Sequence, residues 1–298
     1  MGIGNWEWKE GSERFLLVVN NPFLFTSDLE TLYRSKMTIS IMAFNLRYDK
    51  PDPGNNAWKV RKDAVAAIIQ KHQPDAIGTQ EGKAHQILDL LELLPEYGSL
   101  GGDRLGTGTD ERCAIFYRRE RLVCLAAEDF WLSETPDTPG SITPSWGNHL
   151  PRMATRALFE VVGEERKIAI VNTHLDYNSR QAREKGAKAI CARLANFNAA
   201  DSFLFITGDF NAEPNSTTRN TFLEPFNDGI KLLDATANLS SRERMTYNDF
   251  SDRATIAIDT IYYDSRLKLQ GVQVDTSRIN GILPSDHFPV VGKFANIN

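Results

Sequence analysis

The segment Phe203–Pro214, which reads FLFITGDFNAEP, constrains the fold of this chain more than any other. Its first five residues are apolar or β-branched, as is typical of a strand that is buried on both faces. The run leads directly into Gly208, Asp209, Phe210 and Asn211. In an extended backbone, Asp209 and Asn211 point to the same side. Since ligands of layered α/β folds bind at strand ends, the segment predicts either a functional strand end or a simple Asx turn.

Composition limits the kinds of protein that this chain can be. Its 298 residues carry a formal net charge of -5, and the length suffices for one large hydrophobic core. An acidic chain does not indicate a broad basic face for nucleic acid, although a metal ion could offset local negative charge in an enzyme that acts on phosphates. The cysteines Cys113, Cys124 and Cys191 share no short spacing, which disfavours a zinc knuckle and favours an intracellular setting.

The first 36 residues contain the longest apolar run near the start of the chain, Phe15–Phe25. Acidic residues precede this run, and an Asn-Asn-Pro sequence interrupts it, which does not fit a secretory signal. We therefore expect a cytoplasmic protein without a transmembrane segment. Residues 1–36 are interpreted as an N-terminal extension and residues 37–298 as one domain, and the sequence indicates no particular oligomeric state.

Strand patterns dominate the chain after residue 37. They cover residues 38–44, 75–79, 113–118, 122–126, 155–162, 167–173, 203–207, 257–263, 267–274 and 288–294, whereas helical patterns cover 58–72, 84–94, 180–196 and 217–222. The two strands at 113–118 and 122–126 are close enough in sequence to form a hairpin. Because the regular βαβ alternation of a dinucleotide-binding domain is missing, we predict an α/β (α+β) fold, a four-layer sandwich of two packed mixed β-sheets flanked by helices.

Carboxylates, amides and histidines stand at most of the predicted strand ends. They are Asn45, Gln80, Glu81, His174, Asp209, Asn211, Asp259, Asp286 and His287. Hard oxygen ligands suit Mg²⁺, and histidine and amide donors suit phosphoryl oxygens, so the set indicates hydrolysis of phosphate esters. The HExxH pattern of zinc hydrolases and the GxSxG pattern of serine hydrolases are both absent.

These residues resemble the endonuclease/exonuclease/phosphatase superfamily. The matching motifs are FN at 44–45, QE at 80–81, TH at 173–174, GDFN at 208–211, AIDTIY at 257–262 and SDHFPV at 285–290, and they follow the family's order. The segment 130–152, which begins FWLSETPDTPGS, is similar to an uncharacterised bacterial, deoxyribonuclease-like branch of metal-dependent hydrolases. The resemblance implies Mg²⁺ as the cofactor, with Mn²⁺ as a possible substitute.

The resemblance also implies roles for the residues that would bind metal and water. Glu81 would be the main Mg²⁺ ligand, with Asn45 and Asp286 near the metal. Asp209 would orient or activate the attacking water, and Asn211 would hold both the phosphate and Asp209. As an alternative, Glu81 could be a charge that merely favours the start of a helix.

Three further residues would handle the phosphate and its proton. The resemblance implies that His287 contacts a phosphate oxygen while Asp259 orients it, and that His174 is an acid or phosphate ligand. Glu111 stands where the deoxyribonuclease branch carries the glutamate that pairs with this histidine. His174 could instead be a satisfied core histidine and Glu111 an ordinary exposed acid.

The sequence therefore predicts a Mg²⁺-dependent hydrolase of phosphate esters, foremost a phosphodiesterase and possibly a nuclease. A phosphomonoesterase acting on inositol, lipid-type or small phosphates is the alternative, and a non-catalytic binding module is a third interpretation. Nucleic acid is a possible partner that the charge does not indicate. Arg47 stands where abasic-site endonucleases carry an aspartate, which argues against DNA repair. Arg152 and Arg156 could bind substrate phosphate or form salt bridges on a strand face.

Overall fold

The computed structural model describes residues 37–298 except 196, 198–199, 226–229 and 298. The extension expected for residues 1–36 lies outside the described residues. The first sheet consists, in spatial order, of β11 (Leu267–Val274), β12 (Val290–Asn296), β1 (Thr38–Asn45), β2 (Ala76–Gln80), β4 (Ile115–Arg118) and β3 (Tyr97–Leu100). The second consists of β5 (Leu122–Trp131), β6 (Met153–Val161), β7 (Lys167–His174), β8 (Ser202–Asp209), β10 (Asp259–Asp264) and β9 (Leu232–Asp234).

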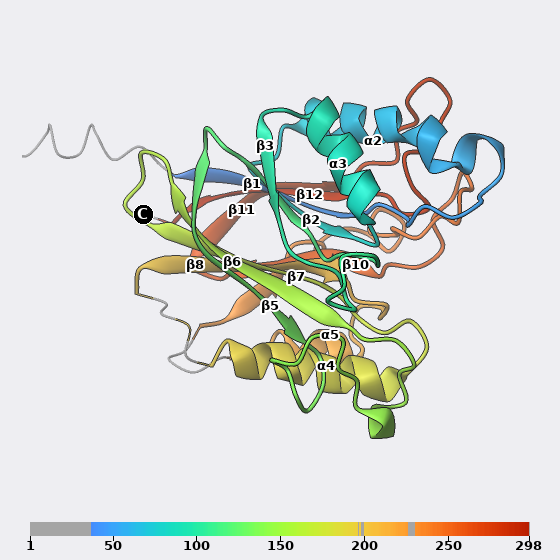
Figure 1. Cartoon of the computed structure of the whole chain (residues 1–298). Coiled ribbons are helices and arrows are strands. Elements are labelled where there is room, and N and C mark those ends of the chain that lie inside the picture. The colour runs from blue at the N-terminus through green and yellow to red at the C-terminus, as the bar shows by residue number, and fades with distance from the viewer. Residues whose placement is uncertain (1–36, 196, 198–199, 226–229, 298) are drawn as a thin grey trace, which may run out of the picture. The chain divides into compact units, whose positions relative to one another are not determined.

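The two sheets lie face to face between helices (Figure 1). Helices α2 (Trp58–His72) and α3 (Ala84–Leu93) cover the outer face of the first sheet, and α4 (Arg180–Arg193) and α5 (Thr217–Thr221) cover that of the second. Two short 3₁₀ turns, η1 (Gly54–Asn56) and η2 (Pro144–Trp146), lie in loops. The predicted four-layer α/β sandwich is confirmed, since both sheets combine parallel and antiparallel pairs.

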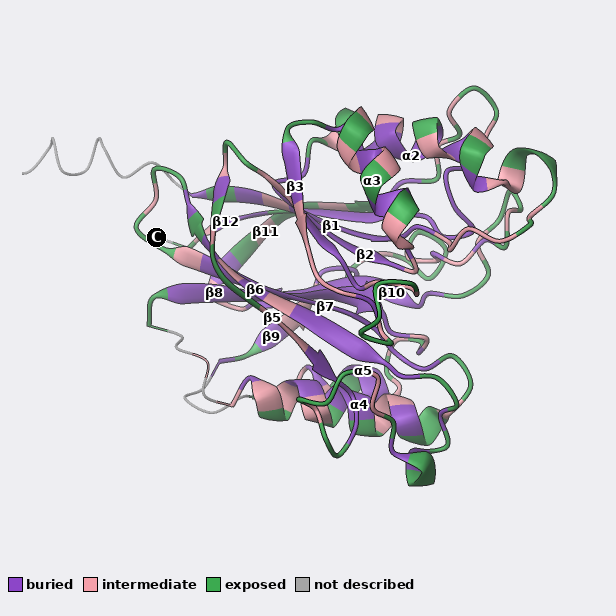
Figure 2. Cartoon of the chain, viewed as in Figure 1, coloured by how far each residue is buried: buried purple, intermediate pink, exposed green. Residues whose placement is uncertain are grey.

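The packing of strand β8 explains why its residues 203–206 are all apolar. Phe203 and Phe205 belong to the hydrophobic cluster between the two sheets. Leu204 and Ile206 belong to the cluster between the second sheet and its helices. Alternate side chains of a strand point to opposite faces, and here both faces are covered, so the whole strand is buried (Figure 2).

The two sheets are in direct contact near the carboxyl ends of β2, β7 and β8. Asn172 Nδ2 on β7 donates to the carbonyl oxygens of Thr79 (2.7 Å) and Ala114 (3.0 Å) in the first sheet. A Cβ atom on Gly78 would collide with Thr207 Oγ1, so only glycine permits this approach. Buried hydrogen bonds between the sheets therefore fix their relative register beneath the strand ends that carry the predicted site.

The hairpin predicted across residues 119–120 is wrong. Strand β4 pairs antiparallel with β2 and β3 in the first sheet, whereas β5 pairs only with β6 in the second. Residues 119–121 thus carry the chain from one sheet to the other. Here Arg121 Nε donates to Asp75 Oδ1 over 3.0 Å, which ties the crossing to the start of β2. Among the described residues, no helix is both long and apolar enough to cross a membrane.

Candidate active site

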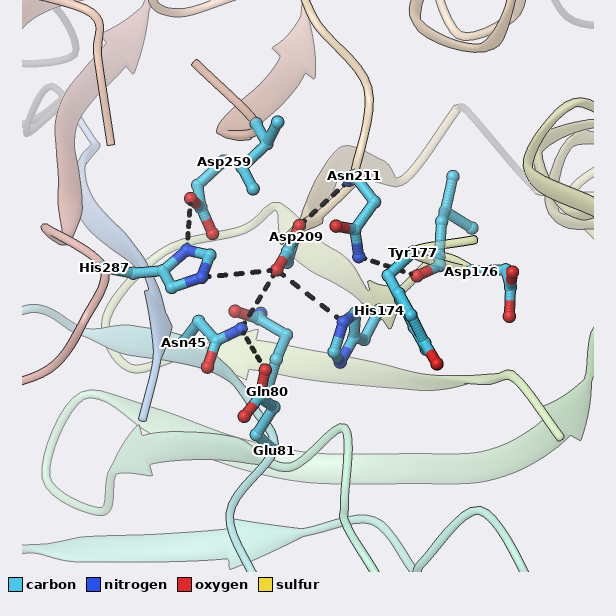
Figure 3. A network of polar contacts seen from close by, with 12 residues as sticks. Asn45, Gln80, Glu81, His174, Asp176, Tyr177, Asp209, Asn211, Asp259 and His287 are labelled. Atoms are coloured by element: carbon cyan, nitrogen blue, oxygen red, sulfur yellow. Dashed lines mark hydrogen bonds and ion pairs between the residues drawn. The ribbon is translucent and has the colours of Figure 1, made fainter. Parts of the chain in front are cut away.

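Strand register brings the predicted site residues together. Strands β1 and β2 run parallel and pair Asn45 with Gln80, so that Glu81 follows directly. Strands β7 and β8 also run parallel and pair His174 with Asp209. Strand β10 runs antiparallel to β8 and pairs Asp259 with the same Asp209. Because carboxyl ends of parallel strands meet at one edge, residues from both sheets surround one point (Figure 3).

Asp209 lies at the centre of this arrangement and is 2% exposed. Its Oδ2 accepts a hydrogen bond of 3.0 Å from Asn45 Nδ2, and its Oδ1 accepts one of 2.9 Å from the backbone N–H of Asn211. Nε2 of His174 and Nε2 of His287 lie 3.7 and 3.8 Å from the same Oδ2. Burial, and then the neighbouring carboxylate of Asp259, raise the pKa of Asp209 to about 7.

Glu81 follows β2 in a left-handed backbone conformation, with a φ of 66°. This conformation is uncommon for a residue other than glycine, and such residues cluster at functional sites. Its Oε1 accepts a hydrogen bond of 3.0 Å from Asn45 Nδ2, and its Oε2 accepts one of 3.0 Å from the backbone N–H of Tyr48. One amide group, that of Asn45, therefore links the carboxylates of Glu81 and Asp209.

His287 and Asp259 form a buried pair. The distance from His287 Nδ1 to Asp259 Oδ2 is 2.8 Å, and the two residues are 4% and 2% exposed. Burial alone would lower the pKa of His287, but the carboxylates of Asp259 and Asp209 outweigh it and hold this pKa well above its usual value. The imidazole of His287 is therefore a cation that can donate from both ring nitrogens.

His174 has the opposite charge state. Burial, followed by the guanidinium groups of Arg152 and Arg104, holds the pKa of His174 well below its usual value. The ring is therefore neutral at pH 7, and its Nε2 can accept a hydrogen bond or a metal ion. The site thus contains one cationic and one neutral histidine, on opposite sides of Asp209 (Figure 3).

Glu111 lies in the same small cleft as Glu81 and His174. Its ion-pair partner is Arg104, whose Nη1 lies 2.9 Å from Glu111 Oε2. Burial, and then the charge of Glu81, raise the pKa of Glu111 to about 7. Its side chain is only 11% exposed, which differs from the ordinary exposed acid that the sequence left open.

Asp286 and Asn211 have partners that local sequence does not indicate. Asp286 Oδ2 lies 3.4 Å from Arg47 Nη1, so a guanidinium faces this carboxylate. The backbone N–H of Asn211, rather than its side chain, holds Asp209, while Asn211 Nδ2 donates to the carbonyl of Leu175 over 3.0 Å. The backbone of Asn211 is left-handed, with a φ of 46°.

Two arginines considered in the sequence differ in position. Arg156 Nη2 pairs with Glu128 on β5 over 2.8 Å, a salt bridge on a strand face. Arg152 is 4% exposed and lines the cleft with Glu81 and Glu111, and its Nε lies 3.4 Å from Asp176 Oδ2. Arg152 therefore belongs to the site region and Arg156 does not.

Sequence reasoning missed Arg104, Arg61 and Tyr177. Arg61 is fully buried, and its guanidinium donates hydrogen bonds to the backbone carbonyls of Leu46 and Pro284, which lie next to Asn45 and near Asp286. Tyr177 is 66% exposed three residues after the histidine at the end of β7. Its signal was an aromatic residue in a polar segment that precedes a helix. Arg61 gave no signal because its partner Pro284 is distant in sequence, and Arg104 gave none because its pairing depends on how its loop folds.

The described residues fit a divalent metal ion. One ligand atom from each of Glu81, His174 and Asp209 lies within 4.8 Å of the others. Asp209, Asp259 and His287 form a second such group, but a protonated imidazole is not a ligand. Carboxylate oxygens with one neutral imidazole suit Mg²⁺ or Mn²⁺ better than a zinc site rich in histidine or cysteine.

The fold and the site define a class of protein. Two six-stranded mixed sheets carry acids and histidines at one shared edge, and the Endonuclease/Exonuclease/phosphatase family model matches residues 42–287. The chain therefore belongs to this family, whose members are hydrolases of phosphate esters. The resemblance seen in the sequence is confirmed.

Solved structures of relatives agree over nearly the whole chain. A family member from Bacteroides vulgatus is 29% identical with a TM-score of 0.79, covering 88% of this chain and 100% of its own. The mannosyl-6-phosphatase Bt3783 of Bacteroides thetaiotaomicron is 28% identical with a TM-score of 0.76, covering 86% of this chain and 99% of its own. Human Nocturnin shares the fold at 21% identity, with a TM-score of 0.67 and coverage of 88% and 98%. A comparison with curated protein sequences gave no match.

Proposed function

We propose that the protein is a Mg²⁺-dependent hydrolase of phosphate esters in which Mn²⁺ can substitute. The observation that carries the proposal is the position of Asp209, buried between a cationic His287 and the Asn45–Glu81 pair. Glu81 would hold the metal, with Asn45 and Asp286 near it. The bound ion would neutralise charge on a phosphoryl oxygen and make the phosphorus more electrophilic.

The chain's own residues supply the remaining steps. Asp209, fixed by the amides of Asn45 and Asn211, orients a water molecule and accepts its proton. His287 donates from Nε2 to a non-bridging phosphoryl oxygen, and Asp259 holds the opposite ring nitrogen. Neutral His174 donates a hydrogen bond from its ring N–H to another phosphoryl oxygen, or, once it has taken up a proton, passes that proton to the leaving oxygen, and Glu111 and Arg104 set the charge around it.

Phosphomonoesters are the substrate class that we place first. A monoester dianion carries more charge than a diester, and the cationic His287 together with a bound metal ion would face that charge. The relative named as a mannosyl-6-phosphatase is 28% identical to this chain. The phosphodiesterase expected from the sequence, with nucleic acid as a possible substrate, is the second candidate. The cytoplasmic location stays a prediction.

A substrate panel tests this proposal. Hydrolysis of mannose 6-phosphate, an inositol phosphate, bis-p-nitrophenyl phosphate, RNA and plasmid DNA is measured with Mg²⁺, with Mn²⁺ and with chelator. Asp209→Asn and His287→Ala should each lower turnover by about 10²–10⁴-fold. Glu120→Gln is the matched control, because its exposed side chain pairs with Arg118 at the opposite end of β4.

Activity that is indifferent to chelator would contradict metal dependence. Full activity in either site variant would contradict the assigned roles. Turnover of the diesters alone would move the second candidate to first place. Metal binding without turnover of any substrate would favour the non-catalytic binding module.

A further inference from the structure

A hollow of about 600 Å³ opens beside the catalytic strand ends. Its walls are the first turns of α4, the loop at 211–218 and the segment at 256–258 that leads into β10. Asn211 belongs both to this hollow and to the group that holds Asp209. The hollow therefore adjoins the group of residues that would bind the phosphate and the attacking water.

Tyr177 stands at this hollow with an exposed side chain on a fixed backbone. Its side chain is 66% exposed and lies next to Asn211 (Figure 3). Arg183 Nη1 donates to the carbonyl of Asp176 over 2.8 Å and to that of Tyr177 over 3.2 Å. Asp176 Oδ1 in turn accepts the backbone N–H of Ser179 over 2.6 Å. The backbone that carries Tyr177 is thus held in place, and although the guanidinium of Arg152 lies 5.7 Å from the centre of its ring, most of the residue stays exposed and can contact a ligand.

The charges that line the hollow balance one another. Arg180 Nε pairs with Glu184 Oε1 over 2.8 Å, and the same lining also contains Arg183 and the exposed Glu213, so two cations stand beside two carboxylates. A polyanionic strand would gain little here, because it needs a surplus of cations. A neutral group with several hydroxyls suits the lining, since it can donate to carboxylates and accept from guanidinium groups.

We infer that this hollow binds the alcohol part of the substrate and that this alcohol is a hydroxylated ring, a hexose, that packs on Tyr177. The inference rests on the proposed function, because phosphate held by His287 and His174 next to Asp209 is what would place the alcohol at the hollow. The apolar face of a sugar ring packs on the aromatic ring, and its hydroxyls reach the charged groups. Ile256, which is 36% exposed in the same lining, adds further apolar surface. Tyr177 is thus a specificity-determining residue.

The test compares two monoesters that share the phosphate and differ in the alcohol. In the full chain with Mg²⁺, kcat and KM are measured for mannose 6-phosphate and for ethyl phosphate. Tyr177→Ala should raise KM for the hexose ester about 5–10-fold more than KM for ethyl phosphate. Tyr177→Trp should restore most of the difference. Leu88→Ala, at a 60% exposed position on α3, is the control for loss of an exposed apolar side chain.

A binding measurement separates this inference from the proposed function. Calorimetry of mannose 6-phosphate with the Asp209→Asn protein should show weaker binding when Tyr177→Ala is added. Equal effects of Tyr177→Ala on both esters, or a stronger preference for a nucleoside 5′-monophosphate than for the hexose ester, would overturn the hexose assignment. Metal-dependent turnover in which kcat/KM for mannose 6-phosphate is no higher than for ethyl phosphate would also overturn the hexose assignment. Absence of turnover with every ester would instead overturn the proposed function, while the binding comparison still tests the hollow.

Discussion

Arg61 on α2 offers the sharpest test of how the fold supports the site. Its side chain is fully buried, and its guanidinium donates only to backbone carbonyls. Nη1 donates to Leu46 over 2.5 Å and to Pro284 over 3.0 Å, Nη2 donates to Arg47 over 2.6 Å, and Nε donates to Asn56 over 3.0 Å. Burial lowers the pKa of Arg61 to about 10, so it stays a cation at pH 7. One side chain thus ties together the loops that follow β1 and precede β12.

Replacing Arg61 with methionine should cost about 3–5 kcal/mol of unfolding free energy. Hydrogen bonds to a charged group contribute about 1.5–3 kcal/mol each, and buried carbonyls left unpaired add a desolvation cost, although these contributions are not additive. The hydrogen bonds of Arg61 hold the backbone next to Asn45 and near Asp286, two residues proposed to lie near the metal. Their loss should therefore also lower metal affinity by about 10–100-fold. Arg61→Lys keeps the charge but loses the planar fork of donors, and an intermediate effect is expected.

Two measurements check this prediction. Urea denaturation gives the unfolding free energy, and calorimetric titration with Mn²⁺ gives affinity and stoichiometry on the folded variants. Arg278→Met is the matched control, because its partner Asp252 is 84% exposed and a surface pair contributes about 1 kcal/mol or less. A loss below about 1 kcal/mol for Arg61→Met, or unchanged Mn²⁺ affinity in both Arg61 variants, would refute the reasoning.

Three further predictions follow from buried acids. Asp259→Asn should lower kcat by about 10²–10⁴-fold while Mn²⁺ affinity in calorimetry stays within a few-fold, because this acid holds His287 rather than the metal. Burial and then Asp259 raise the pKa of Asp209 to about 7, so kcat/KM should fall about tenfold for each pH unit below 7. This fall should begin at a lower pH when the metal concentration is raised, because a nearby cation favours the carboxylate form of Asp209. Burial alone would raise the pKa of Asp275, but hydrogen bonds led by that from His72 hold it well below its usual range. Its stabilisation is therefore complete above pH about 4 and is lost as pH falls further, so Asp275→Asn should cost about 2 kcal/mol in urea melts at pH 7 and progressively less below pH 4.

Local sequence predicted most of the strands and the residues at their ends. The continuous apolar run of β8 indicated a strand buried on both faces, and its neighbours in two separate clusters confirm this. The same segment left Asp209 open between a functional strand end and an Asx turn, and the polar residues at the other strand ends favoured the functional interpretation. The hairpin across residues 119–120 failed for the opposite reason. Two strand patterns that are adjacent in sequence do not show whether the strands pair with each other. Here each strand pairs with partners from another part of the chain, so that β4 and β5 belong to different sheets.

Contacts that depend on loop conformation or on tertiary packing could not be predicted. Glu111 was placed by resemblance, yet its ion pair with Arg104 depends on the conformation of a glycine-rich loop. Arg61 reaches carbonyls up to 223 positions away, and nothing in the pattern of α2 distinguishes it from a surface arginine. The exposure of Tyr177 depends on how Arg183 fixes the segment before α4. Each case depends on tertiary packing, which overrides local preference.

The charges at the centre bear on how many metal ions the site holds. Four carboxylates, those of Glu81, Asp209, Asp259 and Asp286, lie at the centre. Arg47 already faces Asp286, and the imidazolium of His287 already pairs with Asp259. Of the two groups of possible ligand atoms among the described residues, only that of Glu81, His174 and Asp209 lacks a protonated imidazole. The Mn²⁺ titration should therefore give one ion per chain, whereas two would contradict this reasoning.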